Sequence, residues 1–372
     1  MIADPLMSSA WSRSEPLPGS VGASGFLAMQ EAFAEAAGRH GELASARQLE
    51  IAGKAVPMRV VGEALARIVD DAFAHLIEPG DGSDPRPDGR PGIYLWDRSE
   101  ADVPAPPRPA SVEWTSGADG WRLDAYEDLR YVREERADSL IWFDRATGDL
   151  FAMFEDARKF LLYERARPLS RLIPEFCRHL DAHDVHAAAV AWRGKSALIV
   201  GGSGRGKTTT SIDCAVHGLE FLGDDSVAIA ESHGGFSVNS LYASARAHPV
   251  QMHRWPGLNG HWIRPGPADD KALLMPLSVP AVRMARTASV CAIIVPRQDP
   301  SADLFEPVSG SAAFHSLVRD SSENRRFSLR RDQFQRFAKL TQMVPSFAVR
   351  INRPPEAVAQ TIAGIIGRFE HA

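Results

Sequence analysis

The residues with the clearest chemical potential form a glycine-rich loop in the middle of the chain. Residues 201–208 read GGSGRGKT, which fits the phosphate-loop pattern G-x-x-x-x-G-K-[ST]. Glycines let backbone N–H groups close around phosphate oxygens, the lysine reaches the β- and γ-phosphates, and the threonine hydroxyl ligates Mg²⁺. The sequence therefore predicts a site for ATP and Mg²⁺. The residues expected to contact the nucleotide are Gly201, Gly202, Ser203, Gly204, Arg205, Gly206, Lys207, Thr208 and Thr209.

Two adjacent carboxylates lie downstream of this loop. Asp224 and Asp225 follow the apolar stretch 219–222, at 17 and 18 residues after Lys207. Carboxylates in this position can divide two tasks, since one can organise Mg²⁺ and the other can accept the proton of an attacking hydroxyl. The sequence Gly-Asp-Asp-Ser is also ordinary turn chemistry, so the residues alone leave both interpretations open.

A histidine upstream of the loop is a further candidate. His186 begins a strand that turns at residues 193–194 and returns into the loop, which would bring His186 near the loop. A lone histidine is more often structural, and His183 close by shows how little one histidine indicates. Three other cations could neutralise charge on a phosphoryl group, or be surface residues: Arg246, Arg254 and Lys271.

The elements around these residues alternate between strand and helix. The apolar run 196–200 predicts a strand that enters the loop, and residues 208–216 predict a helix that Gly218 ends. A strand predicted at 219–222 then delivers the two carboxylates. This order predicts an α/β nucleotide-binding domain.

The whole set resembles the HPr kinase/phosphorylase family, whose pattern combines a histidine, two strands, a phosphate loop, a helix ending at glycine and a strand ending in Asp-Asp. His186 lies 15 residues before Gly201, and Gly218 lies 11 residues after Lys207, as in that pattern. The resemblance covers residues 184–230. It implies a mixed-sheet kinase domain with a fold similar to the C-terminal domain of phosphoenolpyruvate carboxykinase.

The resemblance also implies roles for the matched residues. Lys207 and Thr208 would bind the phosphates and Mg²⁺, and Asp224 would be the base toward a substrate hydroxyl. Asp225 would support the metal or the substrate, and His186 would lie beside the transferred phosphate. The implied catalytic residues are thus Asp224, Asp225, His186 and Lys207, with Thr208 and Asp225 at the metal.

Two departures from the family pattern bear on the substrate. Thr209 stands where the family has an acidic residue, and no glycine-rich loop of the kind RGLGIINV follows downstream. The first would remove one metal or catalytic contact, and the missing loop argues against HPr itself as the acceptor and against the reverse phosphorylase reaction. The remainder of the chain is more similar to a broader group of HPr-kinase-like bacterial proteins, of which the better-understood members phosphorylate serine on peptides such as lasso-peptide precursors.

The rest of the chain divides into segments. We predict a poorly ordered N-terminus at residues 1–24. A smaller α+β domain that recognises a substrate or partner is predicted at 25–155, and the kinase domain at 156–372. Helices are predicted at 26–38, 62–77, 165–179, 314–318, 331–340 and 356–366. Strands are predicted at 93–96, 272–277 and 290–296, with hairpins at 48–61 around Gly53 and at 139–153.

Composition and charge limit the cellular location and the classes of partner that we expect for this protein. A net charge of −5 gives no general footprint for nucleic acid, and no apolar run approaches the roughly 18 residues of a membrane span. Three scattered cysteines without metal-site spacing fit a reducing compartment. We therefore expect a cytoplasmic protein with no nucleic-acid or membrane partner. Proteins of this kind are often homo-oligomers, although no pattern in this chain demonstrates it.

These observations predict a kinase that uses Mg²⁺ and ATP to phosphorylate a hydroxyl, with a serine of a small protein or peptide as the acceptor. Two alternatives stay open. One is a kinase for a small hydroxylated metabolite, and the other is a binding module that senses ATP without catalysis.

Overall fold

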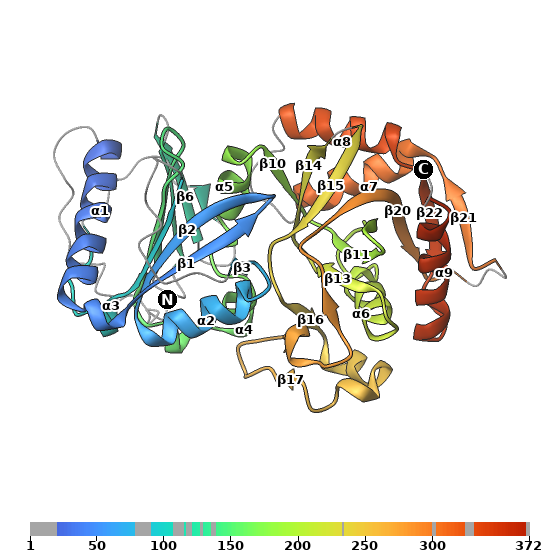
Figure 1. Ribbon diagram of the computed structural model, residues 1–372, viewed down its shortest axis with the longest axis horizontal. Helices are drawn as coiled ribbons and strands as arrows, with labels where there is room; N and C mark the ends of the chain where they lie inside the picture. Colours follow the sequence, from blue (N-terminus) through green and yellow to red (C-terminus); the bar gives the residue numbers. More distant parts are fainter. Residues whose placement is uncertain are drawn as a thin grey trace, which may run out of the picture.

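The computed structural model describes residues 21–78, 91–106, 115–116, 121–126, 129–134, 139–232, 234–299, 303–323 and 331–369. Its architecture is mixed α/β, with two large sheets side by side and a smaller one below the second (Figure 1). Of the N-terminal segment 1–24, residues 1–20 lie outside the described residues and 21–24 begin the first helix.

The first sheet is formed by residues up to 154. Its elements are α1 (Val21–Arg39), β1 (Ala44–Ile51), β2 (Lys54–Val61), α2 (Glu63–Phe73), β3 (Ile77–Glu78), β4 (Ile93–Asp97), α3 (Arg98–Ala101), β5 (Thr115–Ser116), β6 (Trp121–Tyr126), β7 (Leu129–Glu134), β8 (Ser139–Asp144) and β9 (Leu150–Phe154). The strand order is β3-β1-β2-β4-β9-β8-β7-β6-β5. The predicted hairpins β1–β2 and β8–β9 are confirmed. Helix α1 covers one face, and the apolar stripe of α2 packs on the other.

The second sheet carries the phosphate loop. Its elements are β10 (Ala182–Val185), β11 (Ala188–Trp192), β12 (Lys195–Ile199), α6 (Lys207–Val216), β13 (Glu220–Gly223), β14 (Val227–Ser232), β15 (Gly235–Ser240), β19 (Arg283–Met284), β20 (Thr287–Arg297), β21 (Phe305–Val308), α7 (Gly310–Glu323), α8 (Arg331–Met343), β22 (Ser346–Arg350) and α9 (Pro355–Gly367). The main order is β10-β14-β15-β20-β12-β11-β13-β19, and β22 joins β20 beside β21. Since β12 runs parallel to β20 and antiparallel to β11, the sheet is mixed.

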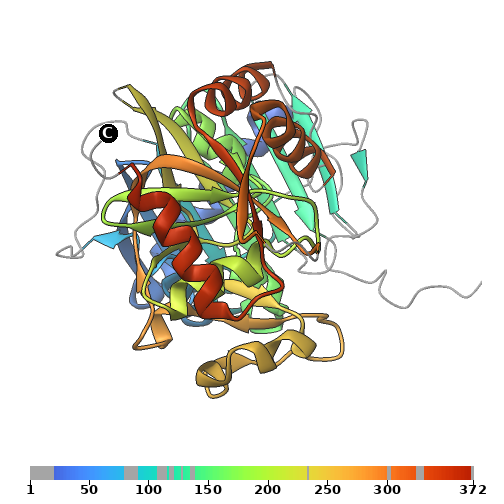
Figure 2. The same ribbon diagram turned by 90° about the vertical axis from the view of Figure 1, so that its right-hand side faces the viewer.

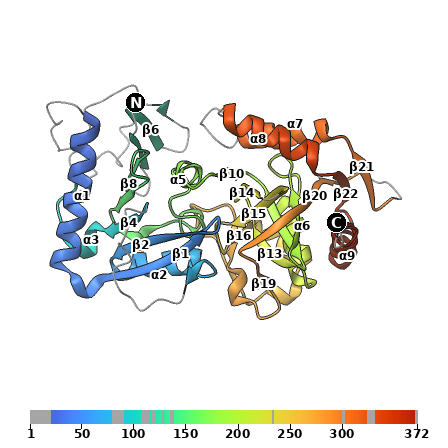
Figure 3. The ribbon, with the colours of Figure 1, turned by 45° about the horizontal axis from the view of Figure 1, so that its top comes forward.

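Helices cover both faces of this second sheet. Successive side chains of a strand point to opposite faces, so Ala197 and Ile199 of β12 pack with α6 and α9, whereas Leu198 and Val200 pack with α7 and α8. Figure 2 shows α9 across one face, and Figure 3 shows α7 and α8 together on the other. This burial fixes the end of β12, where the phosphate loop begins.

The small sheet consists of β16 (Ala245–Ala247), β17 (Trp262–Ile263) and β18 (Ala272–Leu274), in the order β16-β18-β17. It packs against α6 through an apolar cluster that includes Ile212 and Leu274. The strand predicted at 272–277 is shorter than expected, because Pro276 starts a 3₁₀ turn, Pro276–Ser278.

The helix predicted at 165–179 is wrong. The segment forms two short helices, α4 (Leu162–Ala166) and α5 (Ile173–His179), separated by a turn. Proline disfavours helical backbone at the residue before it, so Pro168 ends the helix near Arg167. Leu169 follows with a φ of 64°, in the left-handed region.

This turn lies between the two halves of the molecule. Residues from both halves share one apolar core, which includes Phe176 of α5 and Tyr242. The Tyr242 hydroxyl donates to the carbonyl of Pro168 at 2.9 Å, and the Ser244 hydroxyl donates to the carbonyl of Ala166 at 2.6 Å. The turn is therefore held from the small-sheet side as well as by the first sheet.

In the part of the chain that the structure describes, no helix is long and apolar enough to cross a bilayer.

Candidate active site

The phosphate loop joins β12 to α6. Gly204 and Gly206 have φ values of 73° and 97°, a region that favours glycine. A Cβ added at Gly206 would clash with Cδ1 of the buried Ile351, which would have to shift to admit a side chain there. The buried Lys207 donates from Nζ to the carbonyl of Gly201 at 2.6 Å. The lysine thus bends back over the loop.

Thr208 and Asp224 form a direct pair beneath this loop. Oγ1 of Thr208 lies 2.8 Å and 3.0 Å from the two carboxylate oxygens of Asp224 and donates to them. The backbone N–H of Arg246 donates to the same carboxylate at 3.3 Å. Asp224 is only 3% exposed. Burial, and then the charge of Asp225, raise the pKa of Asp224 to about 7.

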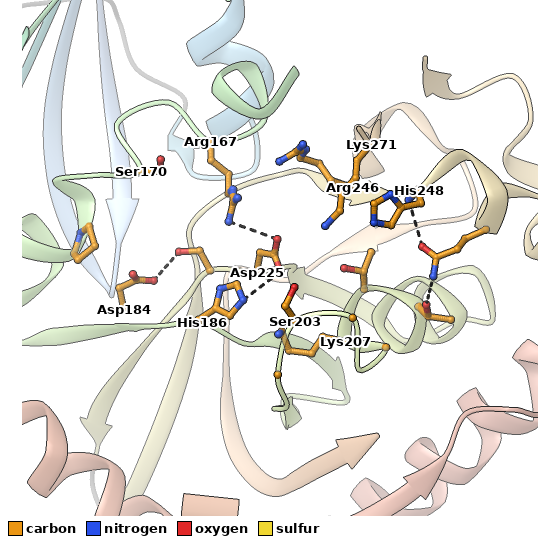
Figure 4. Close-up of a pocket in the computed structure, with 18 of the residues that line it drawn as sticks. Arg167, Ser170, Asp184, His186, Ser203, Lys207, Asp225, Arg246, His248 and Lys271 are labelled. Carbon is orange, nitrogen blue, oxygen red and sulfur yellow. Dashed lines mark hydrogen bonds and ion pairs between the residues drawn. The ribbon is translucent and has the colours of Figure 1, made fainter. Parts of the chain in front are cut away.

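Asp225 faces the opposite way, into a cavity. Its carboxylate lies 3.7 Å from Nε2 of His186 and 3.7 Å from Nη1 of Arg167 (Figure 4). Burial disfavours ionisation of Asp225, but the charges of Arg167 and His186 hold its pKa well below the usual range. The two neighbouring carboxyl groups therefore differ, with Asp225 ionised at neutral pH and Asp224 near its midpoint.

The cavity has a volume of about 380 Å³. Seven residues of the expected nucleotide set line it: Gly202, Ser203, Gly204, Gly206, Lys207, Thr208 and Thr209. Cations outnumber carboxylates among its lining residues, with Arg167, Arg171, Lys207, Arg246 and Lys271 against Asp184 and Asp225. Such a surface suits a polyanion such as a triphosphate.

Three expected residues stand apart from the cavity lining. Gly201 begins the loop and accepts the hydrogen bond from Lys207, and Arg205 is exposed. Asp224 lies behind Thr208. His186 and Asp225 line the cavity together, as expected for side chains that act on one group.

The further cations separate into two groups. Arg246 and Lys271 line the cavity. Arg254 does not, because its guanidinium is bound by the fully buried Asp213 at 2.6 Å and donates to the carbonyl of Arg353. The expectation that Arg254 could serve a phosphate is wrong, since Arg254 neutralises a buried carboxylate.

Sequence reasoning did not predict that residues 167–174 would form one wall of the cavity. Arg167, Ser170 and Arg171 line the cavity from the turn between α4 and α5. A continuous helix would have distributed these side chains around its axis, whereas the turn presents them on one side. The available signal was Pro168, which breaks the helix at this point.

The site offers ligands of the kind that Mg²⁺ prefers. The hydroxyl of Thr208 and the carboxylate oxygens of Asp224 and Asp225 are hard oxygen donors. Within the described residues, no group of three or more histidine, cysteine, aspartate or glutamate side chains forms a complete metal site. Because Mg²⁺ usually keeps several waters and binds through one or two carboxylates plus substrate phosphates, these residues fit a metal that arrives with a nucleotide.

Comparisons with known proteins place the chain only distantly. No protein-family model matches it, and no curated protein matches it either. Among solved structures, it is similar to the Hpr(Ser) kinase/phosphatase from Coxiella burnetii, at 12% sequence identity and a TM-score of 0.31. That match covers 50% of this chain and 89% of the other. It amounts to a distant structural relationship, and the functional conclusion depends on the site itself.

Proposed function

We propose that this protein is a kinase that uses Mg²⁺ and ATP to phosphorylate a hydroxyl, and that the acceptor is a serine of a small protein or peptide. One observation carries the proposal: the phosphate loop opens into the same cavity as Asp225 and His186, with Asp224 bonded to Thr208 directly behind it. Phosphoryl transfer needs these groups in one place, because positioning and charge neutralisation supply most of its rate.

The loop and Thr208 serve the nucleotide in this proposal. The N–H groups of the loop and Nζ of Lys207 hold the β- and γ-phosphates, after Lys207 exchanges the carbonyl of Gly201 for phosphate oxygens. Bound Mg²⁺ would neutralise charge on these phosphates. Asp224 accepts the hydroxyl hydrogen of Thr208, which leaves the lone pairs of that oxygen available to the Mg²⁺ that Thr208 would hold.

In this proposal the two carboxylates exchange the roles that the family resemblance implied: Asp224 supports the metal side through Thr208, and Asp225 is not a metal ligand. Asp225 is the base, because its carboxylate faces the cavity, whereas Asp224 is covered by Thr208. The acceptor oxygen attacks the γ-phosphorus, its proton passes to Asp225, and ADP leaves with its charge balanced at Lys207. A strongly ionised Asp225 suits this step, since the loose transition state demands an oriented acceptor oxygen more than a strong base.

His186 and Arg167 flank Asp225 on two sides. Both orient its carboxylate, and Arg167 adds positive charge where the phosphoryl group moves.

The proposal also assigns a role to each large sheet, following the resemblance of residues 184–230 to the HPr kinase/phosphorylase family. We assign the second sheet to a phosphoenolpyruvate-carboxykinase-like kinase domain, and the first sheet to recognition of the acceptor. The contact of the α4–α5 turn with both the first-sheet core and the cavity supports this assignment, because it gives the first sheet a physical route to the site. A cytoplasmic location, where ATP is available, belongs to the same proposal.

The test uses purified protein with Mg²⁺ and γ-labelled ATP, added to dialysed and undialysed extract of the native host. Wild type is compared with Asp225→Asn, and with Asp71→Asn as a matched control on an exposed carboxylate that does not line the cavity. We expect label on a protein or peptide with wild type and the control, and none with Asp225→Asn.

Two other results would change the proposal. Label confined to small molecules that dialysis removes would make the protein a metabolite kinase. Tight ATP binding without any transfer would favour a nucleotide-sensing module.

A further inference from the structure

The cavity wall opposite the phosphate loop carries two arginines with unused hydrogen-bonding capacity. The Nε atoms of Arg167 and Arg246 are buried, and neither has a hydrogen-bond partner within the described part of the chain. Their ion pairs leave these Nε–H groups without an acceptor: Arg167 lies 3.7 Å from Asp225, and Arg246 donates through Nη2 to Asp270, whose side chain is 69% exposed, at 3.3 Å. A buried guanidinium N–H without an acceptor is unfavourable, so this wall is short of an anion.

Electrostatics support the same reading of this wall. Arg167 and Arg246 line the cavity together with Arg171 and Lys271. Burial, and then the charge of Arg167, lower the pKa of Arg246, which shows that the two guanidinium groups repel each other. An anion between them would relieve both the repulsion and the unpaired Nε atoms.

The wall lies across Asp225 from the phosphate loop (Figure 4). In Figure 4, Arg167, Arg246 and Lys271 lie on the other side of Asp225 from Ser203 and Lys207. If Asp225 receives the proton of the acceptor hydroxyl, the γ-phosphate lies on the loop side and the body of the acceptor lies toward the arginines.

We infer that Arg167 and Arg246 form a second anion subsite, which binds a carboxylate or phosphate group carried by the acceptor beside its reacting hydroxyl. This inference rests on the proposed kinase function. Arginine forks match the planar oxygen pairs of carboxylates and the oxygens of phosphates, which explains why two arginines line this wall. The anionic group belongs either to an acidic residue near the serine of a peptide or to a small phosphorylated alcohol.

Inorganic phosphate tests the subsite directly. The protein is saturated with Mg²⁺ and the β,γ-imido analogue of ATP, which fills the γ-phosphate position, and phosphate is then titrated by calorimetry. Phosphate should bind wild type, and Arg167→Gln or Arg246→Gln should weaken it at least about tenfold. Arg246→Lys should retain part of the affinity, and Arg264→Gln, at an exposed arginine outside the cavity lining, should retain all of it. Thermal unfolding checks that each variant is folded.

Two results would overturn the inference. The first is no phosphate binding to the analogue-loaded wild type. The second is a tenfold loss of analogue affinity in the glutamine variants with phosphate binding unchanged, because the arginines would then serve the nucleotide.

A further experiment separates failure of the anion subsite from failure of the kinase proposal. If wild type fails to bind the analogue, the kinase proposal fails, and phosphate is titrated into nucleotide-free Lys207→Ala. Binding that Arg246→Gln abolishes in that background would keep the subsite, and absence of binding would remove it. Displacement of phosphate by a peptide with aspartates beside a serine, or instead by glycerol 3-phosphate, identifies which source carries the anionic group.

Discussion

Substitution of the buried carboxylate Asp224 by asparagine should stabilise the nucleotide-free protein in a pH-dependent way. Burial and Asp225 raise the pKa of Asp224 from its ordinary 3.8 to about 7. Between these values the folded protein holds a proton that the unfolded chain has released, so the stability linked to this proton is lost as the pH rises toward 7. From pH 5 to pH 8, where the folded carboxyl has lost its proton, the loss corresponds to about 2 pH units at ~1.4 kcal/mol each, or about 3 kcal/mol.

The assay is urea unfolding of wild type and Asp224→Asn without nucleotide at pH 5 and pH 8. The advantage of the asparagine variant in free energy of unfolding should grow by about 3 kcal/mol between the two pH values. Asp270→Asn, at an exposed carboxylate, should show no such growth. The same Asp224→Asn variant should bind Mg²⁺-ATP more weakly, because it loses the acceptor charge at Thr208. A stability difference that stays constant with pH would refute the reasoning.

Three further predictions concern the loop and its support. Thr208→Val should lower the ATP affinity about tenfold or more in the presence of Mg²⁺ and only slightly in its absence, whereas Thr208→Ser should keep the wild-type affinity. Equal affinities by calorimetry for wild type and both variants would contradict the metal role of Thr208. Asp213→Asn should reduce the free energy of unfolding by about 3 kcal/mol, since it leaves Arg254 without its buried partner, and an unchanged urea midpoint would oppose this. Gly206→Ala should destabilise the protein by about 2 kcal/mol and abolish the increase in melting temperature that ATP gives. The new Cβ would clash with Ile351, and position 206 has a φ of 97°, which strains any residue but glycine. A normal increase in melting temperature with ATP would exclude this strain.

Much of the fold around the phosphate loop could be predicted because its signals are local. Apolar alternation and glycine positions predicted a strand at 196–200, a helix at 208–216 and a hairpin at 48–61. The structure has these elements at Lys195–Ile199, at Lys207–Val216, and at Ala44–Ile51 with Lys54–Val61. The break between α4 and α5 was missed because the helical spacing of 165–179 outweighed the single signal from Pro168. The contacts that hold this turn come from Tyr242 and Ser244, more than 70 positions away, and no local pattern reveals them.

The candidate site also depends on contacts that no local sequence pattern reveals. Sequence spacing brought Asp224 and Asp225 to one strand end, but it did not show which carboxylate faces the cavity. That choice depends on the backbone of Asp225, which has a φ of 63°, and on the hydroxyl of Thr208 that covers Asp224. Arg246 and Arg254 also looked equivalent in the sequence, as cations that could serve a phosphate or lie at the surface. Tertiary packing separates them, because one lines the cavity and the other neutralises Asp213.

The most direct test of the central claim is a single-turnover measurement of γ-phosphate transfer by Asp225→Asn, on the acceptor found by labelling, together with its affinity for Mg²⁺-ATP. Asp225 lies in the cavity and takes no part in the bond between Thr208 and Asp224. We predict that transfer falls by a factor of about 100 or more, while the affinity stays within about threefold of wild type. Transfer at the wild-type rate would contradict the assignment of Asp225 as the base and, with it, the proposed use of this cavity.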